Sequence, residues 1–165
     1  MQIPKRKSGR YTTMPFDPHM TQVKLDALRR ELDTLRRVRQ PAAIAETKRL
    51  GELGDFSENA EYQLAKGRLR GINARIDELE YMIRSAVVIA RAEDGHVQIG
   101  SRVAVAIDGE QKIFTILGSS ESDPGRGIIS HTSPIGSALL GKLQGDTFIL
   151  TIGSRQSRCQ IIHVD

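Results

Sequence analysis

The chain has little cysteine and no tryptophan. Its one cysteine among 165 residues, Cys159, cannot form an internal disulfide. Cys159 lies in a segment of alternating apolar residues, and free cysteines are usually buried, so we expect a packed core thiol rather than a reactive one. The four histidines are His19, His96, His131 and His163. They have no metal-ligand spacing with Cys159 or with one another, so the sequence predicts no zinc site.

Long apolar runs are also missing. No stretch is long enough to span a membrane, and no charged-then-apolar segment of a secretory signal is present. We therefore expect a soluble, cytoplasmic protein with no membrane partner. The length of 165 residues suits two small domains and a tail.

Charge is spread unevenly along the chain. Residues 1–20 carry four Lys/Arg against one acid (+3), residues 21–90 thirteen against eleven (+2), and residues 91–165 seven against eight (−1). The first segment has three prolines and little periodicity, which predicts a disordered basic tail over residues 1–20. Solubility alone explains its charge as well as a contact with nucleic-acid phosphates does, and both interpretations stay open.

Two long segments show helical periodicity. The apolar positions of the first are Leu25, Leu28, Leu32 and Leu35, and those of the second are Ile72, Ile76, Leu79 and Ile83. Spacings of three and four predict helices packed along one seam, as in a coiled coil. A first helix from Lys24 to Leu53 would be roughly 45 Å long at about 1.5 Å per residue.

Proline and glycine mark the breaks in this pattern. Pro41 removes a backbone hydrogen bond, so we expect a kink or short break between Arg39 and Pro41. Gly51 and Gly54 allow a tight turn between the helices, which makes them antiparallel neighbours. The sequence therefore predicts an antiparallel helical hairpin over residues 21–92.

After Ala92 the period changes from helical to strand-like. The expected strands cover residues 103–107, 111–117, 127–130, 147–152 and 158–164, and Asp108-Gly109 predicts a two-residue hairpin turn. Ser133 followed by Pro134 fits the start of a short helix that runs to about Lys142. The predicted class is α+β: the hairpin, a boundary near Glu93-Asp94-Gly95, and a small α+β domain over residues 95–165.

Three carboxylates follow the glycines at the tip of the predicted hairpin: Asp55, Glu58 and Glu61. Nothing folds around the end of a narrow rod to exclude water, so such a cluster is poorly placed for an active site of its own but well placed for delivery into another molecule. Asp55 and Glu58 have the spacing of a capping box, which alone would account for both. As exposed carboxylates one turn apart, they also suit Mg²⁺.

Basic residues lie close behind this tip. Lys66 and Arg70 are one turn apart on one helix face, and Arg68 and Arg75 are seven residues apart on another. A solvated helix face explains this spacing, and a nucleic-acid contact stays open beside it.

Two motifs occur in order along the chain. The first is Glu-Leu-Gly-Asp-Phe-Ser-Glu-Asn-Ala-Glu-Tyr (52–62), and the second is Ile129-Ser130 followed by Ser-Pro-Ile-Gly-Ser-Ala-Leu-Leu-Gly-Lys (133–142) and Gly145-Asp146. They resemble the hairpin tip and the C-terminal signature of the bacterial Gre transcript-cleavage factors. The resemblance covers residues 21–165. It implies an antiparallel coiled coil and an FKBP-like C-terminal domain.

The resemblance also implies a function. Such a factor binds bacterial RNA polymerase as a monomer, inserts its coiled coil into the secondary channel, and stimulates the polymerase's Mg²⁺-dependent cleavage of backtracked RNA without being an enzyme alone. Asp55 and Glu58 match the acidic pair that directs an Mg²⁺ ion shared with the polymerase, and Ser133-Pro134 matches the docking loop. On this interpretation the extruded RNA 3′ end is contacted by Lys66, Arg68 and Arg70.

Alternatives remain at this stage. A regulator could dock in the same channel and inhibit the polymerase, although the intact Asp55/Glu58 pair favours cleavage. An FKBP-like fold also suggests a peptidyl-prolyl isomerase, but fold does not carry function, and the aromatic residues of the C-terminal domain are only Phe114 and Phe148. Features of both the GreA and the GreB pattern follow the tip, so the subtype stays open.

Overall fold

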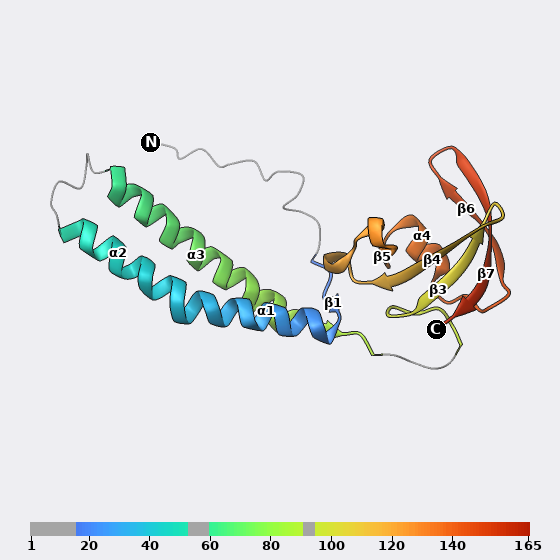
Figure 1. Ribbon diagram of the computed structural model, residues 1–165, viewed down its shortest axis with the longest axis horizontal. Helices are drawn as coiled ribbons and strands as arrows, with labels where there is room; N and C mark the ends of the chain where they lie inside the picture. The colour runs from blue at the N-terminus through green and yellow to red at the C-terminus, as the bar shows by residue number, and fades with distance from the viewer. Residues whose placement is uncertain (1–15, 53–59, 91–94) are drawn as a thin grey trace, which may run out of the picture.

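Two antiparallel helical arms lie side by side, as the apolar stripes predict (Figure 1). The computed structural model describes residues 16–52, 60–90 and 95–165. The first arm comprises α1 (Gln22–Thr34), the π-helical segment η1 (Leu35–Arg39) and α2 (Gln40–Glu52), and the second arm is α3 (Ala60–Ser85). None of the described helices is long and apolar enough to cross a membrane.

The core between the arms narrows toward the loop that joins them. At the other end it is built from large side chains, among them Leu25, Leu28, Ile76 and Leu79. Closer to the loop, the buried residues are Ala43, Leu50 and Ala65. A narrow apolar seam of this kind leaves most of the helix surface in water, so the arms form a slender rod.

The irregularity expected near Pro41 is a π-helical turn rather than a break. Residues Leu35–Arg39 form this turn, and the backbone N–H of Gln40 donates to the carbonyl oxygen of Leu35. Proline cannot donate a backbone hydrogen bond and crowds the preceding helical turn. A wider turn in front of Pro41 accommodates both effects, so the arm continues through it.

The expected role of Gly51 is wrong. Gly51 lies inside α2, which ends at Glu52. A glycine inside a helix costs only up to ~1 kcal/mol relative to alanine, and the buried neighbour Leu50 keeps this turn packed against α3. Gly54, the other expected turn residue, lies outside the described residues.

The C-terminal domain is a five-stranded sheet with one short helix. In spatial order the strands are β5 (Ile128–Ser130), β4 (Glu110–Leu117), β3 (Arg102–Ile107), β7 (Arg155–Val164) and β6 (Thr147–Ile152). All neighbours are antiparallel except β4 and β5. Each of the five expected strands is confirmed.

Local turn chemistry explains the connections in this sheet. Asp108 and Gly109 have φ angles of 50° and 91°, as a two-residue turn with both central residues left-handed requires, which confirms the predicted hairpin. The helix α4 (Pro134–Leu139) begins where predicted but ends before Lys142. Gly141 follows with a positive φ of 76°, which ends the helix.

The sheet and α4 enclose the second core. It contains Val103, Ile116, Leu139 and Ile161, each no more than 1% exposed. Cys159 is also buried there, and this burial raises the pKa of its thiol. The expectation of a packed core thiol is confirmed.

A short parallel pair of strands lies at the base of the hairpin. β1 (His19–Met20) pairs with β2 (Val87–Val88), and Met20 is fully buried in the core of the arms. The ring of Phe16 also packs edge-on against Tyr81 at 5.7 Å. Residues 16–20, which the sequence placed in the tail, therefore belong to the folded junction; residues 1–15 lie outside the described residues.

Candidate functional site

The acidic tip sequence falls between the two arms along the chain. Helix α2 ends at Glu52 and α3 begins at Ala60, so residues 53–59 connect the arms at the end far from the C-terminal domain (Figure 1). Asp55 and Glu58 lie in this segment, outside the described residues, and their capping and metal-binding roles stay predictions. The third acid, Glu61, lies in the first turn of α3.

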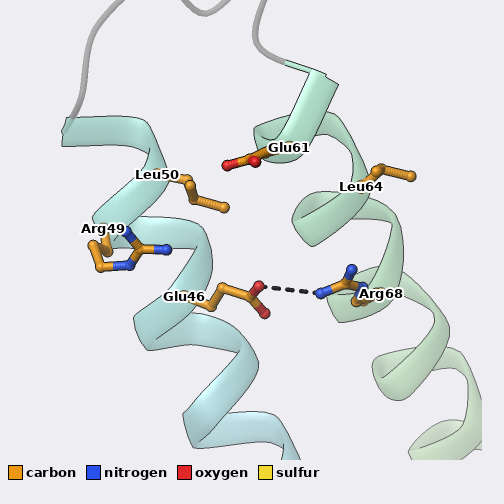
Figure 2. Close-up of a pocket in the computed structure, with 6 residues that line it drawn as sticks. All are labelled: Glu46, Arg49, Leu50, Glu61, Leu64 and Arg68. Atoms are coloured by element: carbon orange, nitrogen blue, oxygen red, sulfur yellow. Dashed lines mark hydrogen bonds and ion pairs between the residues drawn. The ribbon is translucent and has the colours of Figure 1, made fainter.

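A pocket of about 300 Å³ lies between the last turns of α2 and the first turns of α3. It is lined by Glu46, Arg49, Leu50, Glu61, Leu64 and Arg68. Figure 2 shows Glu61 and Leu50 directed toward the space between the arms, and Arg68 reaching across to Glu46, with 3.1 Å between Nη1 and Oε1. Two acidic and two basic side chains line the pocket, so the charge of its lining is balanced.

Cross-arm ion pairs occupy the arginines of one face of α3. Arg68 pairs with Glu46, and Arg75 donates to Glu31 at 2.8 Å. The hydrogen bond from Arg75 holds the pKa of the Glu31 carboxyl below its usual value, and the same bond raises the pKa of the guanidinium. These pairs tie the arms together, although exposed pairs add only ~0–1 kcal/mol each.

Lys66 and Arg70 lie on a different face of the same helix. Both side chains are exposed, and neither makes an ion pair within the described part of the chain. The ammonium of Lys66 lies 5.7 Å from the centre of the Tyr62 ring. The three predicted RNA contacts thus fall into two groups. Arg68 forms an ion pair between the arms, whereas Lys66 and Arg70 remain available for an anionic partner.

The Ser133-Pro134 corner has the predicted local structure. The Ser133 hydroxyl accepts from the Gly136 N–H at 3.1 Å and donates to the Ser130 carbonyl at 2.7 Å. Gly136 allows close packing here, because a Cβ on it would lie 2.1 Å from the Ser130 carbonyl oxygen. Pro134 is exposed at the first position of α4. The corner therefore displays proline on a firmly held turn.

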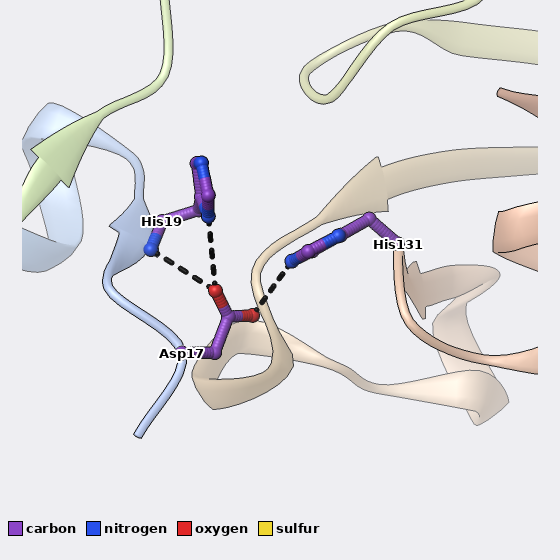
Figure 3. A group of neighbouring side chains, drawn as sticks. All are labelled: Asp17, His19 and His131. Carbon is purple, nitrogen blue, oxygen red and sulfur yellow. Dashed lines mark hydrogen bonds and ion pairs between the residues drawn. The ribbon is translucent and has the colours of Figure 1, made fainter. Parts of the chain in front are cut away.

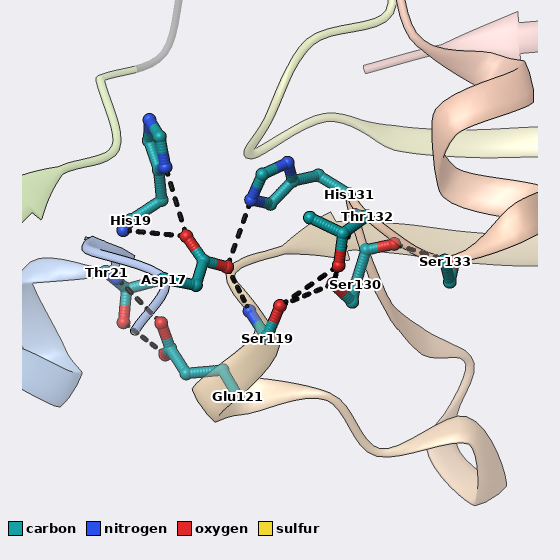
Figure 4. Close-up of polar contacts among 9 residues, drawn as sticks. All are labelled: Asp17, His19, Thr21, Ser119, Glu121, Ser130, His131, Thr132 and Ser133. Atoms are coloured by element: carbon teal, nitrogen blue, oxygen red, sulfur yellow. Dashed lines mark hydrogen bonds and ion pairs between the residues drawn. The ribbon is translucent and has the colours of Figure 1, made fainter. Parts of the chain in front are cut away.

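The sequence missed a polar cluster that joins the two domains. Thr21 caps α1 by accepting from the Lys24 N–H, and its own N–H and hydroxyl donate to Glu121 at 2.8 and 2.6 Å (Figure 4). Asp17 accepts from the Ser119 N–H at 2.6 Å. A threonine before an apolar stripe is a helix-start signal, but no local signal reveals a partner a hundred residues away.

Histidines meet in the same cluster, contrary to the expectation from their spacing. His19 and His131 both lie against Asp17, and these three could together ligate a metal ion. The Asp17-Pro18-His19 segment supplies two of the side chains, whereas the third comes from the other domain. Spacing along the chain could not predict this group.

Comparison with known proteins agrees with this architecture. Residues 19–88 match the family model "Transcription elongation factor, N-terminal", and residues 92–165 match "Transcription elongation factor, GreA/GreB, C-term". The chain belongs to the GreA/GreB family. The resemblance seen in the tip and C-terminal motifs is thereby confirmed.

Individual members of the GreA/GreB family extend the match over most of the chain. Transcription elongation factor GreA of Bacillus cytotoxicus is 38% identical over 149 residues, covering 88% of this chain and 94% of the relative. GreA of Helicobacter hepaticus is 37% identical and covers 88% and 91%, and that of Macrococcus caseolyticus is 39% identical and covers 88% and 94%.

Solved structures of the family also resemble this chain. GreA factor homolog 1 (Gfh1) of Thermus thermophilus is 25% identical, with a TM-score of 0.41, and covers 88% of this chain and 97% of its own. GreA/GreB from Nitrosomonas europaea is 26% identical, with a TM-score of 0.39, and covers 73% and 92%.

Proposed function

We propose that this protein binds bacterial RNA polymerase, inserts its helical hairpin into the secondary channel, and stimulates the polymerase's own cleavage of backtracked RNA. One observation supports this function above the others: the family's acidic tip sequence connects two arms that form a slender rod. The 26 residues of α3 alone would span about 40 Å at about 1.5 Å per residue. A rod of this shape can carry carboxylates into a narrow channel.

The chemistry proposed for the tip rests on Asp55 and Glu58. Their carboxylate oxygens are hard ligands, and Mg²⁺ typically takes one or two such ligands while leaving the rest of its shell to water and phosphate. The donor set therefore fits an ion shared with the polymerase. When bound, a second metal beside the polymerase's own would stabilise the attacking and leaving oxygens of an in-line displacement. The protein thus assists a reaction that it does not catalyse alone.

Lys66 and Arg70 would hold the extruded RNA behind the tip. Each exposes a cation outside the cross-arm ion pairs, so neither must break an ion pair within the described residues to contact a phosphate. Arg68 is in the same stretch of helix but pairs with Glu46, and RNA would have to compete with that carboxylate. We assign the larger share of the RNA contact to Lys66 and Arg70.

The C-terminal domain would dock on the polymerase surface through the Ser133-Pro134 corner. Pro134 is exposed and held by the hydrogen bonds of Ser133 to Gly136 and Ser130. The contacts of Asp17 and Thr21 with residues 119–131 connect this domain to the hairpin base. Docking and insertion are therefore mechanically coupled through the junction.

Stalled polymerase tests this function. Purified bacterial polymerase is halted on a template in a backtracked state with 5′-labelled RNA, and the protein is added with Mg²⁺. We expect shortened RNA that is extended again when nucleotides are restored. If the protein binds the polymerase but no shortened RNA forms, the result favours the inhibitory function over stimulation of cleavage.

A further inference from the structure

Three metal-ligating side chains converge at the junction between the hairpin and the C-terminal domain (Figure 3). Nδ1 of His19 lies 3.1 Å from one oxygen of Asp17, and Nε2 of His131 lies 3.0 Å from the other. One ligand atom from each residue falls within 4.8 Å of the others. The two rings meet edge to face, with 5.1 Å between their centres.

The donor types select a class of ion. Two imidazole nitrogens with one carboxylate suit Zn²⁺ and the neighbouring transition metals, whereas Mg²⁺ and Ca²⁺ prefer oxygen alone. Tetrahedral Zn²⁺ with bonds of about 2.0–2.1 Å keeps its ligand atoms about 3.3 Å apart. The two imidazole nitrogens lie 3.1 and 3.0 Å from different oxygens of Asp17, and the three ligand atoms fall within 4.8 Å of one another, so side-chain rotations would bring them to the spacing that an ion needs.

Backbone N–H groups hold the carboxylate in place. The Ser119 N–H donates to one oxygen of Asp17 at 2.6 Å, and the His19 N–H donates to the other at 3.1 Å. Burial alone would raise the pKa of Asp17, but these bonds and the one from His131 outweigh it and hold the pKa well below its usual range. Metal-ligating carboxylates are commonly oriented by such outer hydrogen bonds.

The surroundings of the cluster are polar and leave a path for an ion. The hydroxyls of Ser119, Ser130 and Thr132 are mutually hydrogen-bonded beside the cluster, at 2.7 to 3.2 Å (Figure 4). The side chains of Asp17 and His131 are 11% and 16% exposed, whereas that of His19 is 36% exposed. An ion could therefore enter from the His19 side and keep a water in its remaining position.

We propose that Asp17, His19 and His131 bind one transition-metal ion of the Zn²⁺ class and that this ion cross-links the hairpin to the C-terminal domain. Asp17 and His19 precede α1, whereas His131 directly follows β5, so the ligands belong to both domains. A bound ion would fix the orientation between the rod and the docking domain. The site is separate from the acidic tip in place, donor type and ion, and it does not depend on the proposed function.

Cobalt provides a direct test on the full chain, purified without a histidine tag. Tetrahedral Co²⁺ absorbs visible light far more strongly than the aqueous ion, so a titration reports both geometry and stoichiometry. We expect saturation at one Co²⁺ per chain and displacement by Zn²⁺. His131→Gln and His19→Gln should each weaken binding by roughly tenfold or more, since each removes a ligand. His163→Gln, which changes an exposed histidine 2.8 Å from Asp165, is the matched control and should bind normally.

Thermal unfolding separates loss of a ligand from loss of the fold. Zn²⁺ at about one hundred times the parent Kd should raise the midpoint of the parent and of His163→Gln by roughly 5–10 °C, and should raise that of His131→Gln by about half as much or less. Glutamine can still donate to Asp17, so in EDTA the midpoints of the variants should lie near that of the parent. If the midpoint of His131→Gln falls in EDTA, the comparison with and without Zn²⁺ is made on His19→Gln, whose side chain is more exposed. Absence of saturable Co²⁺ binding, or binding that persists in His19→Gln/His131→Gln, would overturn the proposal.

Discussion

Asp17 Oδ2 lies 3.0 Å from His131 Nε2, although 114 residues separate them in the chain. The same oxygen accepts the Ser119 N–H at 2.6 Å, so one carboxylate ties the start of the hairpin to two points of the C-terminal domain. Thr21 and Glu121 add two further hydrogen bonds beside it. The domains are therefore joined through a specific polar interface as well as through the covalent link.

The first prediction concerns the pH dependence of this interface. The pKa of Asp17 is lower in the folded chain than the unperturbed value of about 3.9, so the folded state binds fewer protons there. The stabilisation is therefore complete above about pH 4 and is lost as pH falls through the folded pKa. Asp17→Asn should lower the free energy of unfolding at pH 7 by ~1–3 kcal/mol, and its difference from the parent should shrink below about pH 4.

Urea unfolding in EDTA from pH 7 down to pH 2 measures this effect. Asp165→Asn is the matched control, because Asp165 faces His163 at 2.8 Å in an exposed pair. It should change stability by at most a few tenths of a kcal/mol. A constant difference between Asp17→Asn and the parent across the whole range would show that the charge of Asp17 does not stabilise the junction.

The parts of this fold that the sequence predicts are those set by local patterns. Apolar stripes defined the arms, and left-handed turn residues such as Asp108 and Gly109 defined the β-hairpin. The junction escaped prediction because its strands are two residues long and its contacts pair residues 17–21 with residues 119–131. Two-residue strands have no detectable period, and long-range polar pairs leave no local signal.

The candidate site residues were likewise predictable only where the signal is local in the sequence. The Ser133 cap could be predicted because a cap and a proline occur in adjacent positions. The division between Arg68 and its neighbours Lys66 and Arg70 could not, because it depends on Glu46 of the opposite arm. Helical spacing gives the face on which a residue lies, but only the pairing of the arms gives its partner.

The second prediction concerns Gly118, where the backbones of the two domains approach closely. Its φ of −67° suits any residue, but a Cβ there would lie 1.8 Å from the carbonyl oxygen of His19. Gly118→Ala should therefore push β1 away from the C-terminal domain and destabilise the junction by ~1–3 kcal/mol. Hydrogen exchange should speed up at the amides of Val87 and Ile89, which donate to Pro18 and Met20.

Gly71→Ala provides the contrasting substitution. Gly71 lies in α3, and no atom lies within 4 Å of the position that an alanine methyl group would take, so alanine should stabilise the hairpin by up to ~1 kcal/mol. Exchange at Val87 and Ile89 should then stay at the parent rate or slow. Equal exchange rates in Gly118→Ala and the parent would mean that the junction does not need the close contact.

The third prediction concerns the exposed cations on α3. Replacing both Lys66 and Arg70 with glutamine keeps helix propensity nearly unchanged, so stability should hold. Crosslinking to extruded RNA and cleavage in deeply backtracked complexes should fall, and the loss should be larger at low salt, where charges are least screened. The measurement compares both activities at two salt concentrations.

Arg68→Gln is the control on the other face. It removes the ion pair with Glu46 and should cost ~0–1 kcal/mol of stability with a smaller effect on RNA crosslinking. If Lys66→Gln/Arg70→Gln stayed fully active on short and long backtracks, the cations would be no more than a solvated helix face. A loss in Arg68→Gln as large as in the double variant would show that RNA displaces Glu46.

The fourth prediction separates the two roles open to Asp55. Asparagine caps a helix about as well as aspartate, so Asp55→Asn should change stability by only a few tenths of a kcal/mol. It is neutral and a much poorer ligand for Mg²⁺. If Asp55 helps to hold the shared ion, the variant should keep its thermal midpoint and its polymerase binding yet lose most cleavage stimulation, with partial rescue by raised Mg²⁺ or Mn²⁺.

Asp33→Asn is the matched control for Asp55→Asn. Asp33 is an exposed aspartate on the same rod, paired with Arg37 at 2.5 Å and far along the first arm from the loop. Losing its charge should cost ~0–1 kcal/mol of stability and should leave cleavage intact, because the substitution touches neither the tip nor α3. Cleavage assays on backtracked polymerase at several Mg²⁺ concentrations compare the two variants. Full activity of Asp55→Asn at ordinary Mg²⁺ would rule out the metal role and leave helix capping as a sufficient reason for this aspartate.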